Sequence, residues 1–166
     1  MSMRLRFPRH AGHRGFTLIE VVITLAIIGL LATAAAPLAS VALKRAKESE
    51  LKAALREIRT GIDAYKEAAD SGRIEVAADA SGYPPELKLL YEGVEDKTSP
   101  DRKLIYFMRR LPRDPFFPDA TVPPEETWGL RSYSSPPDAP AAGDDVFDVY
   151  ALSKDKGLNG VPYRDW

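Results

Sequence analysis

Residues 16–43 read FTLIEVVITLAIIGLLATAAAPLASVAL, and this stretch decides the fold. Residues 21–43 contain no charged side chain, and 18 of these 23 residues are Ala, Val, Ile or Leu. As an α-helix they span ~35 Å, which is enough to cross a hydrocarbon core of ~30 Å. We therefore expect residues 16–43 to form a transmembrane helix. The alternative is a buried core helix, although an uncharged run this long is unusual in a chain of 166 residues.

A basic segment without acids precedes the apolar run. Residues 1–15 contain four Arg and no Asp or Glu. A secretory signal peptide also begins with basic residues, but its apolar region is typically ~7–15 residues long and ends at a small-residue cleavage site. Residues 34–36 (AAA) offer such a site, yet the run before them is long and contains Glu20 near its start. Because a carboxylate at the centre of a membrane costs ~2.5–3.5 kcal/mol, we expect Glu20 to have a basic partner.

The start of the run carries a specific motif. Residues 14–20 (RGFTLIE) closely resemble the cleavage and methylation signature of type IV pilins and type II secretion pseudopilins. In that signature a short basic leader ends in Gly, and Phe opens an apolar helix with Glu as the fifth residue after the cut. The resemblance implies that a prepilin peptidase cuts between Gly15 and Phe16 and methylates the new amine of Phe16. Gly lets a protease approach the backbone, and the basic leader stays in the cytoplasm.

The resemblance also assigns roles to Glu20 and Pro37. In the family, the Glu20 carboxylate pairs with the Phe16 ammonium of a neighbouring subunit, in a filament core where an unpaired charge is costly. The alternative is an interfacial acid without a role. The family often carries a Pro at the position of Pro37, and a Pro inside a helix removes a hydrogen bond and kinks or opens the helix. Pro37 is predicted either to break the helix when subunits pack or to mark the end of the span.

The helical period continues beyond the span, over residues 44–71. Apolar residues recur every three or four positions, which is the pattern of one buried helix face. The opposite face is charged, and Glu48 and Lys52 on it form a favourable i,i+4 pair. One helix of about fifty residues is expected, ending at Ser71-Gly72; a soluble coiled coil is the weaker alternative, because the stripe lasts under three heptads. The stripe consists of Leu51, Leu55, Ile58, Ile62, Tyr65 and Ala69.

Residues 72–166 are expected to form a periplasmic globular head. Because this head combines the long helix with a small antiparallel sheet, the predicted fold class is α+β. We predict a short helix at 86–91, a strand or helix at 104–111, and strands at 127–134 and 146–153. Two or three antiparallel strands pack on the amphipathic helix in this prediction. The stretch PRDPF at 112–116 resembles the family's Pro-x-Asp-Pro-Trp turn, with Phe116 as the aromatic core plug. The expected strand contributions to the core are Trp128, Tyr133, Phe147 and Tyr150.

The C-terminal loop, residues 152–166, needs a clamp other than a disulfide, because the chain has no Cys. The resemblance to major type II pseudopilins implies Ca²⁺ in this loop, held by carboxylates and backbone carbonyls. The alternative is a metal-free turn, with Asp155 as a cap and Asp165 paired to Arg164 or to a Lys. The candidate calcium ligands are Asp155, Asn159 and Asp165 through their side chains, and Leu152 and Ser153 through their carbonyls.

The residue inventory makes catalysis improbable. His10 and His13 both lie in the leader, so residues 16–166 contain no His or Cys to serve as base, thiol nucleophile or transition-metal ligand. No phosphate- or dinucleotide-binding glycine pattern occurs. Loss of the four leader Arg leaves 19 basic against 24 acidic residues, a charge of -5 in place of -1. We therefore expect neither an enzyme nor a nucleic-acid-binding protein.

The resemblance implies a structural subunit of the periplasmic pseudopilus of type II protein secretion. Such a subunit is a single-pass inner-membrane protein with a cytoplasmic N-terminus, and it polymerises with copies of itself into a helical filament that drives export. The implied partners are the prepilin peptidase, the inner-membrane secretion platform and the minor pseudopilins. Two alternatives are a type IV pilus subunit for adhesion, motility or DNA uptake, and a monomeric membrane-anchored binding module.

Overall fold

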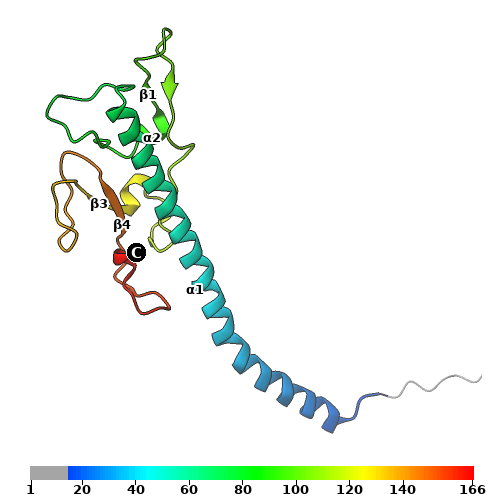
Figure 1. Cartoon of the computed structure of the whole chain (residues 1–166). Coiled ribbons are helices and arrows are strands. Elements are labelled where there is room, and N and C mark those ends of the chain that lie inside the picture. The colour runs from blue at the N-terminus through cyan, green and yellow to red at the C-terminus, as the bar shows by residue number, and fades with distance from the viewer. Residues whose placement is uncertain (1–14) are drawn as a thin grey trace, which may run out of the picture. The chain divides into compact units, whose positions relative to one another are not determined.

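The computed structural model describes residues 15–166, so the predicted leader lies almost entirely outside the described residues. The described chain falls into two units. Leu43–Trp166 is one compact unit, and the residues before Leu43 belong to another. Figure 1 shows the chain with its elements labelled.

The long helix expected from the sequence is present as α1, Leu18–Asp70, with 53 residues (Figure 1). Pro37 lies inside α1, so the helix does not end there, and its predicted opening on subunit packing stays a prediction. Every side chain described between residues 18 and 43 is exposed. Among the described helices, α1 is the one long and apolar enough to cross a membrane.

The C-terminal end of α1 lies where the sequence indicated it. Gly72 has a φ of 70°, the left-handed conformation that glycine adopts after many helices. The N–H of Gly72 donates to the Ala69 carbonyl at 3.0 Å, and the N–H of Arg73 donates to the Ala68 carbonyl at 2.9 Å. These bonds satisfy carbonyls that the last turn of a helix leaves free.

The head contains two small antiparallel sheets rather than one. Strand β1 (Val94–Glu95) pairs with β2 (Leu104–Ile105), and β3 (Trp128–Arg131) pairs with β4 (Asp148–Ala151). These strands confirm the α+β class but are shorter than predicted, and only the first two residues of the 104–111 segment are extended in a sheet. The remaining elements are α2 (Leu89–Glu92) and the 3₁₀ turns Pro124–Thr127 and Tyr163–Asp165.

The apolar stripe of α1 is the main wall of the core, as predicted. Leu51, Leu55, Ile58 and Ile62 are at most 2 % exposed. Tyr65 is also buried, and Ala69 packs against the cluster from its edge. Further core residues come from α2, the strands, the connecting segments and the chain terminus; they include Ile74, Leu87, Leu90, Met108, Leu111, Trp128, Val146, Val149, Ala151 and Tyr163.

The expectation that four strand aromatics fill the core was wrong for three of them. Trp128 is buried, but Tyr133 is 63 % exposed, and Phe147 and Tyr150 are only partly buried. Alternate residues of a strand point to opposite faces, so the inward positions of β4 go to Val149 and Ala151.

The other three aromatics pack against neighbours outside the buried cluster instead. Gly129 pairs with Tyr150 across the sheet, and the Tyr150 ring lies where a Gly129 side chain would be, 2.2 Å from an added Cβ. Tyr133, just beyond β3, stacks on Tyr83 with ring centroids 5.6 Å apart and meets the edge of Phe147 at 5.5 Å. The strand pattern predicted large apolar side chains but not the face that each one occupies.

Replacing Ile58 tests whether the stripe of α1 holds the head together. The Ile58→Ala change leaves a cavity at a fully buried position, so we expect the free energy of unfolding to fall by ~2–5 kcal/mol. Fluorescence of the buried Trp128, followed through denaturant unfolding of the full chain in detergent, measures this change. Thr60→Ala, at an exposed position two residues on, is the matched control and should stay within ~0.5 kcal/mol.

Candidate assembly site and C-terminal loop

The motif predicted to be cleaved lies before the first turn of α1. Gly15, Phe16 and Thr17 are outside the helix, and Phe16 is 82 % exposed. A Cβ added to Gly15 would meet no atom within 4 Å. The Gly15–Phe16 peptide bond therefore has the open, non-helical backbone that a protease needs, and cleavage there stays a prediction.

Glu20 lies in the first turn of α1, and its side chain is exposed. Its backbone N–H donates to the Thr17 hydroxyl at 3.3 Å, so Thr17 caps the helix. Thr followed three residues later by Glu is the pattern of a capping box, and sequence reasoning missed Thr17 in this role. The next basic residue in the chain is Lys44, which lies 24 residues or ~36 Å further along a helix. The helix that carries Glu20 therefore offers its carboxylate no cation.

The hydroxyl groups inside the apolar run are satisfied within the helix. Thr24, Thr33 and Ser40 each donate to the carbonyl three residues earlier, at 2.9, 2.7 and 2.8 Å. A hydroxyl without a partner is costly in an apolar environment, and these bonds remove that cost. Glu20 is therefore the one side chain of residues 18–43 that demands a partner from outside the helix.

The predicted calcium ligands lie in the C-terminal loop, and two of their side chains have partners within it. The Asn159 side-chain oxygen accepts from the Val161 N–H at 3.1 Å, and Asp165 lies 3.9 Å from Arg164. The Asp155 carbonyl accepts from the Tyr163 N–H, while its side chain is exposed. Within residues 15–166 no three acidic side chains group in a way that would hold a metal ion. The Asp165–Arg164 contact is the one expected for the metal-free turn.

Glu48 of α1 holds this loop from the helix side. It is 9 % exposed, and its Oε1 atom accepts from the Leu158 N–H at 2.8 Å and from the Tyr163 hydroxyl at 3.0 Å. Burial, together with the bond to Glu48, raises the pKa of the Tyr163 hydroxyl, so Tyr163 remains a proton donor. The sequence pattern placed Glu48 on the solvent face beside Lys52. That interpretation was wrong, because the loop covers this part of the polar face.

Lys44 and Lys52, one helical turn before and after Glu48, also contact the C-terminal loop. Lys44 Nζ donates to the Lys156 carbonyl at 2.8 Å and lies 5.8 Å from the centre of the Tyr163 ring. Lys52 Nζ lies 4.4 Å from the centre of the Trp166 ring, a cation–π distance. Positions four residues apart share one helix face, so a single row of α1 side chains holds the loop.

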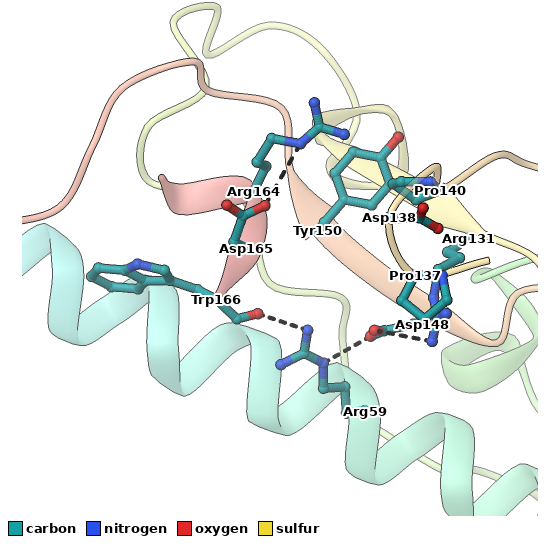
Figure 2. Close-up of a pocket in the computed structure, with 10 residues that line it drawn as sticks. All are labelled: Arg59, Arg131, Pro137, Asp138, Pro140, Asp148, Tyr150, Arg164, Asp165 and Trp166. Carbon is teal, nitrogen blue, oxygen red and sulfur yellow. Dashed lines mark hydrogen bonds and ion pairs between the residues drawn. The ribbon is translucent and has the colours of Figure 1, made fainter. Parts of the chain in front are cut away.

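Arg59 extends the same attachment to β4 (Figure 2). Its Nε donates to Asp148 at 2.8 Å, and its Nη2 donates to the Trp166 backbone oxygen at 2.9 Å. Figure 2 shows Arg59 reaching from the helix to both partners. Arg59 and Asp148 also line a hollow of about 570 Å³. Arg131 lies 3.9 Å from the same Asp148 carboxylate. These paired charges tie α1, β3 and β4 together.

The turn at residues 112–116 supports the loop from the other side. The Asp114 side chain is 2 % exposed and accepts from the Phe116 N–H at 2.8 Å, and burial raises the pKa of this carboxyl. The Phe116 ring stacks on Tyr163 with centroids 4.2 Å apart. Phe116 therefore packs against the core as predicted, and it does so through the residue that Glu48 binds.

Comparison with known proteins agrees with the motif and extends beyond it. Residues 11–36 match the family described as Prokaryotic N-terminal methylation motif. Type II secretion system core protein G of Klebsiella michiganensis is 26% identical over 151 residues, covering 88% of this chain and 99% of that protein. The protein of the same name from Escherichia coli strain K12 is 28% identical over 148 residues, covering 86% and 94%. No solved structure matches the chain.

A capped N-terminal helix whose apolar part, residues 18–43, carries one acid, a methylation motif and a small α+β head define a pilin-like protein. Within that class the chain is homologous, over most of its length, to type II secretion system core protein G.

The Glu48 contact predicts a large effect of a single substitution. Glu48→Ala leaves the Leu158 N–H and the buried Tyr163 hydroxyl without an acceptor, so we expect the free energy of unfolding to fall by about 2–4 kcal/mol. Denaturant unfolding measures the loss, and hydrogen exchange of the Leu158 amide should accelerate. Glu50→Ala removes an exposed carboxylate two residues away and serves as the control. Equal stability of the two variants would show that Glu48 does not hold the loop.

Proposed function

We propose that the chain is a structural subunit of a type II secretion pseudopilus, polymerised through the N-terminal half of α1. The observation that carries the proposal is the contrast within one helix. The described side chains of residues 18–43 are all exposed, whereas residues 51–65 bury a single stripe in the head. Apolar surface stabilises a protein only where it leaves water, so residues 18–43 need lipid or other copies of the helix around them. A stored form in the membrane and an assembled filament each meet that need.

Glu20 gives the assembled form its register in this proposal. After cleavage between Gly15 and Phe16, a neighbouring subunit offers a methylated ammonium at Phe16. A carboxylate surrounded by apolar helices is costly without a partner, and the ammonium of the neighbour neutralises it. Subunits displaced from this register would leave both charges unpaired, so the pair favours one axial offset.

The same proposal sets the cellular context. The chain is processed by the prepilin peptidase and resides in the inner membrane with its head in the periplasm. It assembles with the secretion platform and the minor pseudopilins. The similarity to core protein G over 88% of the chain supports a pseudopilus rather than a type IV pilus. We propose no catalytic role, because residues 16–166 carry neither His nor Cys and the relatives are proteins of a secretion system.

For the C-terminal loop we propose the metal-free turn. Calcium requires six to eight oxygen ligands, whereas Asp165 lies beside Arg164 and the Asn159 oxygen already accepts a backbone N–H. Lys44 and Lys156 also bring positive charge to the loop. These observations support a loop that is held by side chains of α1.

A Glu20→Ala variant tests the assembly mechanism. Removing one partner of a buried ion pair costs ~3–5 kcal/mol, so we expect filament yield to fall by more than ~100-fold. Intact mass should show that the variant still loses residues 1–15 and gains one methyl group, because Glu20 lies beyond the cut. Electron microscopy of sheared filaments and an export assay measure assembly.

The matched control is Thr24→Ala, which alters the same helix but only removes a hydroxyl bonded to its own backbone. It should assemble normally. Normal filaments and export from Glu20→Ala would contradict the pairing. A mature mass that retains residues 1–15, or that indicates a cut after Ala36, would contradict the proposed function as a whole.

The loop makes a separate prediction about calcium. A ligand that binds only the folded state raises stability by ~2.7 kcal/mol at 100 times its dissociation constant. A metal-free turn should therefore melt at the same temperature in a calcium chelator and in excess Ca²⁺. A higher melting temperature with Ca²⁺, lost in Asp155→Asn, would show instead that the calcium ligands predicted from the sequence do form a site.

A further inference from the structure

The C-terminal loop exposes an unusual mixture of side chains. Leu158 is 44 % exposed and Val161 is 39 % exposed, although both are large and apolar. Lys154 and Lys156 of the same loop are exposed as well, with the exposed acid Asp155 between them. Exposed apolar groups beside lysines are typical of protein surfaces that lie in the interface of a membrane.

The position of this loop is set by α1. Lys44 binds the Lys156 carbonyl and Glu48 binds the Leu158 N–H, so the loop lies against the first turns of the helix in the head. Lys44 directly follows Leu43, the last residue of the uncharged run. One helical turn rises ~5.4 Å, so the loop lies beside the part of the chain that emerges from the membrane.

Charge is distributed unevenly between the end of the head next to the apolar run, residues 44–56 and 152–158, and the rest of the head. Residues 44–56 and 152–158 contain seven basic and three acidic residues, and one of the three acids is the buried Glu48. The remaining residues from 57 onward contain twelve basic and twenty acidic residues. The acidic head therefore has a basic end, and that end is the one joined to the membrane span.

We propose that this end of the head binds the phosphate groups of anionic phospholipids while the subunit is stored in the membrane. The lipid-facing surface consists of Arg45, Lys47, Lys154, Lys156, Leu158 and Val161. The basic side chains pair with lipid phosphates, and Leu158 and Val161 enter the interface between headgroups and acyl chains. The bonds from Lys44 and Glu48 hold the loop in position for this contact. The proposal rests on the membrane anchoring that is part of the proposed function.

The same surface points to lipid rather than to a second copy of the chain. A membrane interface accommodates the lysines and the two apolar side chains together, because lipid phosphates lie directly beside the acyl chains. The sequence position of Lys44, next to the span, brings lipid headgroups to this surface without any assembly step. Contact with a second copy is the competing outcome that the experiment must separate.

The test uses the full chain in nanodiscs, one copy per disc. One set contains phosphatidylcholine only, and the other replaces part of it with phosphatidylglycerol. Hydrogen exchange of residues 152–162 is measured in both sets, at low and high salt. We expect severalfold slower exchange in the anionic discs, reversed by salt because screening weakens the ion pairs. Inorganic phosphate added to neutral discs should not reproduce the protection, which separates a lipid surface from a free-phosphate site.

Variants make the test specific to this surface. The double change Lys154→Gln and Lys156→Gln should abolish the effect of anionic lipid. Lys97→Gln with Lys103→Gln, which removes two exposed lysines elsewhere in the head, should retain it. Melting of both variants in neutral discs checks that the head remains folded, because neither pair lies in the core.

Three results would contradict the proposal or the function on which it rests. Equal exchange in neutral and anionic discs would overturn the proposal. Protection that follows the number of copies per disc, rather than lipid charge, would assign the surface to contact between subunits and overturn it as well. If the chain does not enter the discs at all, the membrane anchoring fails, and with it the proposed function on which this inference rests.

Discussion

The structure depends on a single helix whose two parts need different environments: one is covered by the head, and the other is exposed and apolar. The C-terminal part of α1 has one apolar stripe, and the head covers it, so that Leu51 and Ile58 are fully buried. The N-terminal part is apolar on every side and is exposed along its whole described length. Apolar surface of that extent is unstable in water, so this part of the chain requires an environment that the monomer does not provide. The proposed membrane anchoring and the proposed polymerisation each meet that requirement.

The second constraint is the attachment of a C-terminal loop without a disulfide. Here α1 supplies a row of side chains four residues apart, from Lys44 through Glu48 to Lys52. Glu48 is the central member, because a buried carboxylate is tolerated only when it accepts hydrogen bonds, and it accepts two. The helix that forms the core of the head therefore also holds its C-terminal loop in place. Both halves of the molecule therefore depend on the same continuous helix.

Several features could be read directly from the sequence because their causes are local. The long helix, its end at Gly72 and the motif at residues 14–20 depend on neighbouring residues in the chain. The predictions that were wrong concern features that depend on residues far apart in the chain. The sequence patterns at 127–134 and 146–153 indicated extended chain, but strand pairing and burial decided that Val149 faces inward while Tyr150 covers Gly129. Thr17 was missed although its capping signal was present three residues before Glu20.

The sequence by itself determined the apolar segment, its single acid, the processing motif and the amphipathic stripe, because periodicity and charge act over a few residues. Only the tertiary structure decided the role of Glu48, whose acceptor atom meets a backbone N–H 110 residues further along the chain. On the helix alone Glu48 belongs to a charged, solvated face. The loop that covers Glu48 is positioned by the fold of the whole head. A local sequence pattern does not predict which part of a polar helix face another segment will bury.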